Sequence, residues 1–197
     1  MSTAIVIRLV FWSWFAVAVL VGQQRLLQRL PLPAAPGIAL ALTALLLIGY
    51  FCLTALREWV HRLDLRGLVL VHVSRLIGIY FLPLYARGEL PYAFAVPGGI
   101  GDIIVALCAL LVVFLPVGYE RRQHLIYIWN VVGFIDIMLI VATAAYFSFT
   151  GSTQMRPLTR LPLSLLPTFL VPLIISTHIV IFARIARARA VTTTIAR

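Results

Sequence analysis

The chain has 197 residues, of which 62% are hydrophobic and only 11% are charged, and its formal net charge is +10. A water-soluble domain of this length carries about 25% charged residues because it needs a polar shell, so the composition excludes a soluble globular protein. All sixteen basic residues are arginines. They flank apolar segments instead of gathering on one aqueous face, which argues against a nucleic-acid partner and indicates contact with the anionic headgroups of a lipid bilayer.

Six apolar stretches are long enough to cross a membrane, since a spanning helix needs about 20 residues. Short segments rich in Arg, Pro, Gly and Gln separate them, and none is long enough to hold a soluble domain. We therefore predict an all-α integral membrane protein with a single six-helix transmembrane domain over residues 1–197. The predicted spans are residues 4–22, 37–56, 67–86, 94–115, 125–148 and 161–183.

The arginines beside these spans predict how the bundle is oriented. Ten lie on the side that carries both termini and five on the opposite side, while Arg75 lies inside the third span. The ten are Arg8, Arg57, Arg62, Arg66, Arg121, Arg122, Arg184, Arg187, Arg189 and Arg197, and the five are Arg25, Arg29, Arg87, Arg156 and Arg160. By the positive-inside rule, both termini are expected in the cytoplasm, with the chain in a bacterial-type inner (plasma) membrane.

Glycine and proline interrupt the fourth and sixth spans, which we expect to be kinked or broken. The fourth contains AFAVPGGIGDIIVAL, in which Gly98 and Gly99 follow Pro97. The sixth contains LPLSLLPTFLVPLII, in which Pro167 and Pro172 each remove a backbone hydrogen-bond donor. Irregular backbone at membrane depth is tolerated where protein or a wet cavity satisfies it. The alternative is that membrane helices simply use more Gly and Pro than soluble ones.

Five ionisable residues lie inside the predicted spans: His72, Arg75, Asp102, Asp136 and His178. Charges inside a bilayer are costly, so such groups usually face the bundle interior and pair with one another. Helical rise places Arg75, Asp102 and Asp136 near the middle of the membrane. We expect Arg75 to pair first with Asp136 and second with Asp102. One Arg against two Asp leaves a surplus negative charge, which favours a proton on one carboxyl or a bound cation.

The two histidines are expected closer to the cytoplasm and at matching depth, about 8 Å below the boundary. His72 is three residues before Arg75 on the same helical face, and His178 points inward from the sixth span. Asn130 and Ser164 are candidate supporting residues, as are Gly98 and Gly99 in the interrupted fourth span.

Three functions fit this pattern. The first is proton-linked or small-solute transport through His72, Arg75, Asp102, Asp136 and His178, because chains of Asp, His and Arg mark ion and proton pathways. The second is a b-type cytochrome with haem iron held between His72 and His178. The third is a non-catalytic accessory or assembly subunit whose buried charges fix helix register.

Enzyme chemistry is not favoured, because the sequence contains no H-E-x-x-H, no G-x-S-x-G and no other paired catalytic motif. Apart from the bilayer, the expected partners are a second copy of the chain or other membrane subunits. Haem b is the cofactor that the second of the three functions implies.

Overall fold

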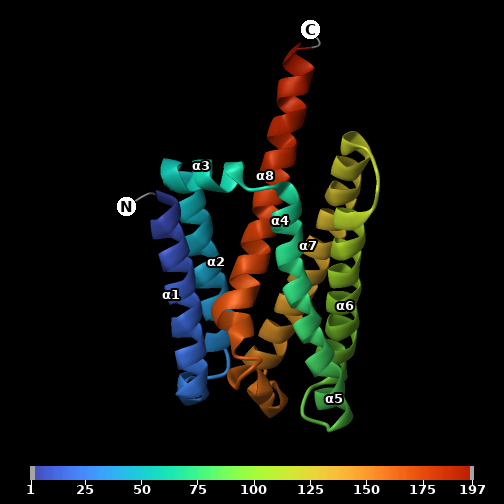
Figure 1. Cartoon of the computed structure of the whole chain (residues 1–197). Helices are drawn as coiled ribbons and strands as arrows, with labels where there is room; N and C mark the ends of the chain where they lie inside the picture. The colour runs from blue at the N-terminus through green and yellow to red at the C-terminus, as the bar shows by residue number, and fades with distance from the viewer. Residues whose placement is uncertain (1–2, 196–197) are drawn as a thin grey trace.

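The computed structural model describes residues 3–195, with side chains for residues 3–188, and this part contains helices and turns but no strand. Six helical segments in it are long and apolar enough to cross a membrane, and they stand side by side as a bundle (Figure 1). The all-α, six-helix fold class is confirmed, and these helices support a multi-pass membrane protein.

The first two spans are α1 (Thr3–Gln23) and α2 (Ala34–Cys52), joined by the short 3₁₀ helix η1 (Leu26–Arg29). Helix α3 (Thr54–Arg62) follows and lies across the end of the bundle (Figure 1). Its sequence, TALREWVHR, mixes arginines with Leu, Trp and Val, the composition of a helix that lies at a membrane interface.

The third span is continuous but changes its helical type. It consists of α4 (Leu65–Leu70), the 3₁₀ helix η2 (Val71–Tyr80) and α5 (Phe81–Ala86). Ten consecutive 3₁₀ residues are uncommon, since 3₁₀ runs rarely exceed three or four. Side chains three apart eclipse in this geometry, and buried residues recur here at every third position. They are Val69, His72, Arg75, Gly78 and Phe81.

The fourth and fifth spans are α6 (Tyr92–Phe114) and α7 (Tyr119–Phe149). Helix α6 packs against both η2 and α7, two of the helices that supply ionisable side chains. It continues as one helix through Pro97, which has no N–H to donate to the helix.

The sixth span is the more irregular of the two proline-containing spans. After the 3₁₀ helix η3 (Thr153–Thr159) and a turn with a cis Leu161–Pro162 bond, the π-helix η4 (Leu166–Leu170) leads into α8 (Val171–Ile195). The span therefore begins at Leu166 rather than near residue 161, because Pro162 belongs to the turn. It also extends past residue 183, and α8 projects beyond the other helices (Figure 1).

The arginines divide between the two ends of the bundle. The end at which α3 lies also carries the start of α4, the end of α6 and the start of α7 (Figure 1); we call it the arginine-rich end, since Arg57, Arg62, Arg66, Arg121 and Arg122 lie there. Arg197 and the side chain of Arg189 lie outside the described residues. That the arginine-rich end faces the cytoplasm stays a prediction.

The buried apolar side chains form two clusters at different levels of the bundle. One contains Phe81, Phe94, Ile137 and Ile174, and the other, towards the arginine-rich end, contains Val69, Val105, Trp129 and Val180. On the third to sixth spans, the polar residues lie between the members of these two clusters. The polar layer thus lies between two apolar clusters.

Candidate functional site

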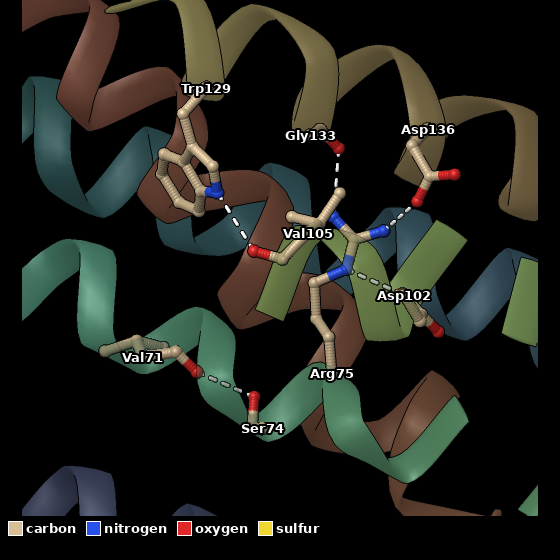
Figure 2. Close-up of polar contacts among 8 residues, drawn as sticks. All are labelled: Val71, Ser74, Arg75, Asp102, Val105, Trp129, Gly133 and Asp136. Atoms are coloured by element: carbon tan, nitrogen blue, oxygen red, sulfur yellow. Dashed lines mark hydrogen bonds and ion pairs between the residues drawn. The ribbon is translucent and has the colours of Figure 1, made fainter. Parts of the chain in front are cut away.

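Arg75 is the centre of the polar layer and is 1% exposed. Its Nε donates to Asp102 Oδ1 at 2.6 Å, its Nη1 donates to the carbonyl oxygen of Gly133 at 3.0 Å, and its Nη2 donates to Asp136 Oδ2 (Figure 2). One guanidinium from η2 therefore joins α6 and α7. The expected pairing of Arg75 with both aspartates is present.

The two carboxylates differ in their surroundings. The Asp102 side chain is 5% exposed, whereas that of Asp136 is 22% exposed. Together with Arg75 they carry a formal charge of minus one when both are ionised. A net charge at this depth is costly, so the cluster has the composition of a site that takes up one proton or one monovalent cation.

Three glycines make room for the polar side chains. A Cβ on Gly78 would lie 2.6 Å from Asp102 Cβ, a Cβ on Gly133 would lie 2.9 Å from His178 Cε1, and a Cβ on Gly101 would collide with Asp136 Oδ1. Each of these polar side chains thus packs against a glycine of a neighbouring span, an approach that any larger residue would prevent.

The histidine pair lies next to this cluster. The ring centroids of His72 and His178 are 4.2 Å apart, and the Trp129 ring lies 4.9 Å from His72 and 5.6 Å from His178. The indole Nε1–H of Trp129 donates to the Val105 carbonyl at 3.0 Å (Figure 2), which fixes the ring against both imidazoles. The expectation of equal depth for the two histidines agrees with this contact.

The hydrogen bonds indicate which ring nitrogen of each histidine carries a proton towards its partner. Asn130 Nδ2 donates to the His178 carbonyl at 3.1 Å, so Asn130 Oδ1 is left to accept from His178 Nδ1–H at 2.8 Å. The Thr177 hydroxyl donates to the Leu173 or Ile174 carbonyl and therefore accepts from His72 Nε2–H at 3.1 Å. The opposite ring nitrogens, His72 Nδ1 and His178 Nε2, are buried with no hydrogen-bond partner in the described structure.

Gly133 connects the two groups of polar residues. Its carbonyl accepts from Arg75, and its α-carbon faces His178 closely enough that a Cβ would lie 3.3 Å from His178 Nε2. One backbone position of α7 thus separates the unpartnered imidazole nitrogen from the guanidinium. The charged cluster and the histidine pair form one continuous polar site.

The geometry does not suit a haem between the histidines. A haem ligated by two histidines has its macrocycle between the imidazole rings, whereas these rings are in direct contact. Haem ligation stays a prediction, and the arrangement of the two rings argues against it. Within the described residues, no group of three or more His, Cys, Asp or Glu side chains could hold a metal ion.

A cavity of about 60 Å³ lies on the side of Arg75 away from the arginine-rich end. Arg75 and Asp102 form part of its wall, and Ser148 and Thr159 are the other polar residues that line it. The remaining lining is apolar and comes mainly from α2, α7, η3 and the start of the sixth span. The polar site therefore has a small, largely apolar space beside it.

The sequence-predicted supporting residues differ in where they lie. Asn130 is fully buried and bonds His178, as described above. Gly99 lies against η2, where a Cβ would be 2.9 Å from the Gly78 carbonyl oxygen, and Gly98 lies against Ile140 of α7. Ser164 is fully buried but lies against Gly22 of α1, where a Cβ would be 2.5 Å from its Oγ. Their functional roles stay predictions.

Five further residues belong to the site but are not among the site residues predicted from the sequence. They are Gly78, Gly101, Gly133, Trp129 and Thr177. Trp129, Gly133 and Asp136 are spaced to share one face of an α-helix, so helical periodicity is the signal that could have found the first two. Thr177 is adjacent to His178 in the sequence, and no periodic pattern marks it. Gly78 is three residues after Arg75, and only the 3₁₀ geometry of η2 places it in line with His72 and Arg75.

Comparison with known proteins gives a family for the chain. Searches of curated proteins and of solved structures found no match. A family model described as a domain of unknown function (DUF8737) matches residues 33–186. The matched region contains the third to fifth spans and the part of the sixth span that carries His178, and thus the whole polar site. Since the match covers well over half of its length, the chain belongs to the DUF8737 family.

Proposed function

We propose that this protein moves protons across the membrane, and that the proton binds at Arg75, Asp102 and Asp136. The observation that carries the proposal is the charge count of the buried cluster: one guanidinium bonds two carboxylates. A proton on one carboxyl makes the cluster neutral, and its loss leaves a net negative charge in the membrane interior. Chains of such residues inside bundles commonly form proton pathways.

The surroundings of the cluster supply a route on either side. In this proposal protons reach the cluster from the end opposite the arginine-rich end, through the small cavity that Asp102 lines. On the other side, the unpartnered nitrogens His178 Nε2 and His72 Nδ1 are acceptors for a proton that leaves the cluster. In this proposal the proton passes from Asp102 or Asp136, past Gly133, to the histidine pair and then to the cytoplasm.

The test is proton flux in vesicles that contain the purified protein and a pH-sensitive dye, with the membrane potential clamped. Wild-type protein should dissipate a pH gradient faster than protein-free vesicles, and Asp102→Asn and Asp136→Asn should reduce the rate to that background. Glu89→Gln is the matched control, because Glu89 is an exposed carboxylate paired with Arg87. Wild-type flux equal to that of empty vesicles, or full flux in both Asn variants, would contradict the proposal.

The same bonds also favour a structural role, in which the chain is an accessory subunit. Arg75 links three spans, and a buried ion network of this kind can fix helix register. The two roles differ in the flux of the wild-type protein, which Asp136→Asn can abolish only if the site conducts protons; the substitution leaves a neutral Arg75–Asp102 pair. A purely structural network should tolerate that substitution, with unchanged stability and no proton flux to lose.

A further inference from the structure

A second polar pocket, separate from the membrane-interior site, opens at the arginine-rich end. It has a volume of about 420 Å³ and lies between α4, α7 and α8. Three arginines and a single carboxylate line it, so its wall has an excess of positive charge. The polar lining residues are Arg66, Arg122, Arg184, Asp64, Gln123 and Tyr119.

Neutral acceptors hold two of these guanidinium groups in place. Arg122 donates to the carbonyl oxygens of Val113, Leu115 and Val117, between the end of α6 and the start of α7. Arg184 Nη1 donates to the Leu63 carbonyl at 2.8 Å. These bonds fix the positions of the arginines without neutralising them, and no described salt bridge involves Arg66, Arg122 or Arg184. Arg122 Nε is buried and has no hydrogen-bond partner in the described structure.

The N-terminus of α7 also borders the pocket, and its first turn carries the exposed carboxylate of Glu120. Its N-cap residue, Gly118, provides no side-chain cap, and the residues on either side of Gly118 both line the pocket. By contrast, the N-terminus of α4 is capped by Asp64, which accepts from the Arg66 amide at 3.0 Å. An uncapped helix N-terminus presents free amide groups and a partial positive charge, which favour a bound anion.

The nearby His61 lies among further arginines of this end. Burial and the charges of Arg187, Arg184 and Arg57 lower the pKa of His61 below its usual value. His61 also accepts from Arg187 Nη1 at 3.0 Å through Nε2, which requires an unprotonated nitrogen. The positive field at this end therefore extends from the pocket to α3.

We propose that this pocket binds the phosphate of an anionic membrane lipid. The arginines offer the geometry that suits a phosphate group, and basic pockets between membrane helices are established places for lipid headgroups. Leu65, Ile126 and Ile185 form apolar lining beside the arginines, which suits the glycerol and acyl part of a lipid and offers nothing to free phosphate. The pocket also lies where apolar spans begin and end, at the level of the headgroups.

The experiment measures binding to the full-length protein in detergent micelles. Phosphatidylglycerol is titrated against phosphatidylcholine, with the apparent melting temperature as the readout. Phosphatidylglycerol should raise it and phosphatidylcholine should not. Arg66→Gln should weaken the apparent affinity for phosphatidylglycerol by about fivefold. Arg62→Gln is the matched control, since Arg62 is also exposed at this end but does not line the pocket.

Two further measurements keep the proposal decisive. Inorganic phosphate alone should leave the melting temperature unchanged; a rise equal to that from phosphatidylglycerol would assign the pocket to free phosphate and overturn the lipid proposal. If Arg66→Gln does not fold, native mass spectrometry of wild-type protein in an equal mixture of the two lipids decides. Preferential retention of phosphatidylglycerol supports the proposal, whereas equal retention, or an unchanged affinity in Arg66→Gln, overturns it.

Discussion

Gly78 is the position at which Asp102 of α6 approaches the third span most closely. A methyl group there would lie 2.6 Å from Asp102 Cβ and 3.0 Å from Asp102 Oδ2, so Gly78→Ala must push the carboxylate away from Arg75 Nε. We expect a loss of about 1–3 kcal/mol in the free energy of unfolding, measured by denaturation in mixed micelles.

Gly37 provides the control for this substitution. It lies within α2, and a Cβ there would meet nothing within 4 Å, so Gly37→Ala should stabilise the protein by up to about 1 kcal/mol through helix propensity. If both alanines change stability equally, close packing at Gly78 does not hold Asp102 in place.

Among the residues of the site, Arg75 is the one whose substitution should lower the free energy of unfolding most. Arg75→Met leaves Asp102 and Asp136 facing each other in the interior without a cation, and breaking a buried ion pair in this way costs about 3–5 kcal/mol. Adding Asp136→Asn removes one of the two stranded carboxylates and should recover a substantial part of the loss. Denaturation of the two single variants and the double variant measures this coupling. A double variant no more stable than Arg75→Met would show that Asp136 contributes nothing to the network.

At the residue scale, the charged members of the site could be predicted from the sequence, whereas the hydrogen-bond geometry that joins them could not. Arg75, Asp102 and Asp136 are conspicuous because ionisable residues are rare in apolar spans, and cost alone predicts that they pair. The hydrogen bonds of Asn130 and Thr177 depend on side-chain conformations that no periodic pattern records. The role of Gly101 depends on how close α6 and α7 approach each other, which emerges only when the helices pack.

At the scale of elements, the third span shows where helical periodicity misleads. Spacings of three and four residues both occur on one face of an α-helix, so VHVSRLIGIY is compatible with either helix type. The structure uses 3₁₀ geometry from Val71 to Tyr80, which brings His72, Arg75 and Gly78 into a single row. Local propensity does not favour such a long 3₁₀ run, so its cause lies in the tertiary contacts of that row.

The sixth span, in contrast, is expected to be irregular because of its prolines. The same lack of a proline N–H explains its hydrogen bond with Trp14 of α1. Pro172 has no N–H to donate to the carbonyl of Thr168, four residues earlier, and Trp14 Nε1 of α1 donates to that carbonyl at 2.9 Å instead. Trp14→Phe should therefore cost about 1 kcal/mol, because it removes this hydrogen bond. Trp12→Phe is the control, since Trp12 is 62% exposed on the same helix. Equal stability of the two variants would exclude this role for Trp14.

At the scale of the whole molecule, composition determines more than any motif does. The excess of apolar residues predicts six spans, and the structure has six helices of suitable length and hydropathy within the described residues. The ionisable residues of four spans lie at similar depth. The buried apolar side chains are therefore divided into two clusters with a polar layer between them. The small cavity beside that layer does not follow, since it depends on how η3 and the start of the sixth span fold back against α2 and α7.

The orientation of the bundle is open to a direct test with two engineered cysteines. In a background with Cys52→Ser and Cys108→Ser, Glu120→Cys places a thiol at the arginine-rich end and Glu89→Cys places one at the opposite end, and both positions are exposed. Ten of the sixteen arginines belong to the side of the termini, so the positive-inside rule predicts that this side faces the cytoplasm. A membrane-impermeant maleimide should therefore label Glu89→Cys in intact spheroplasts and leave Glu120→Cys unmodified. Both should label after lysis, which controls for thiol reactivity. The loss of the Arg87–Glu89 pair is tolerable, since exposed ion pairs contribute little to stability. Labelling of Glu120→Cys in intact spheroplasts would place the arginine-rich end outside and would reverse the direction in which the proposed proton path runs.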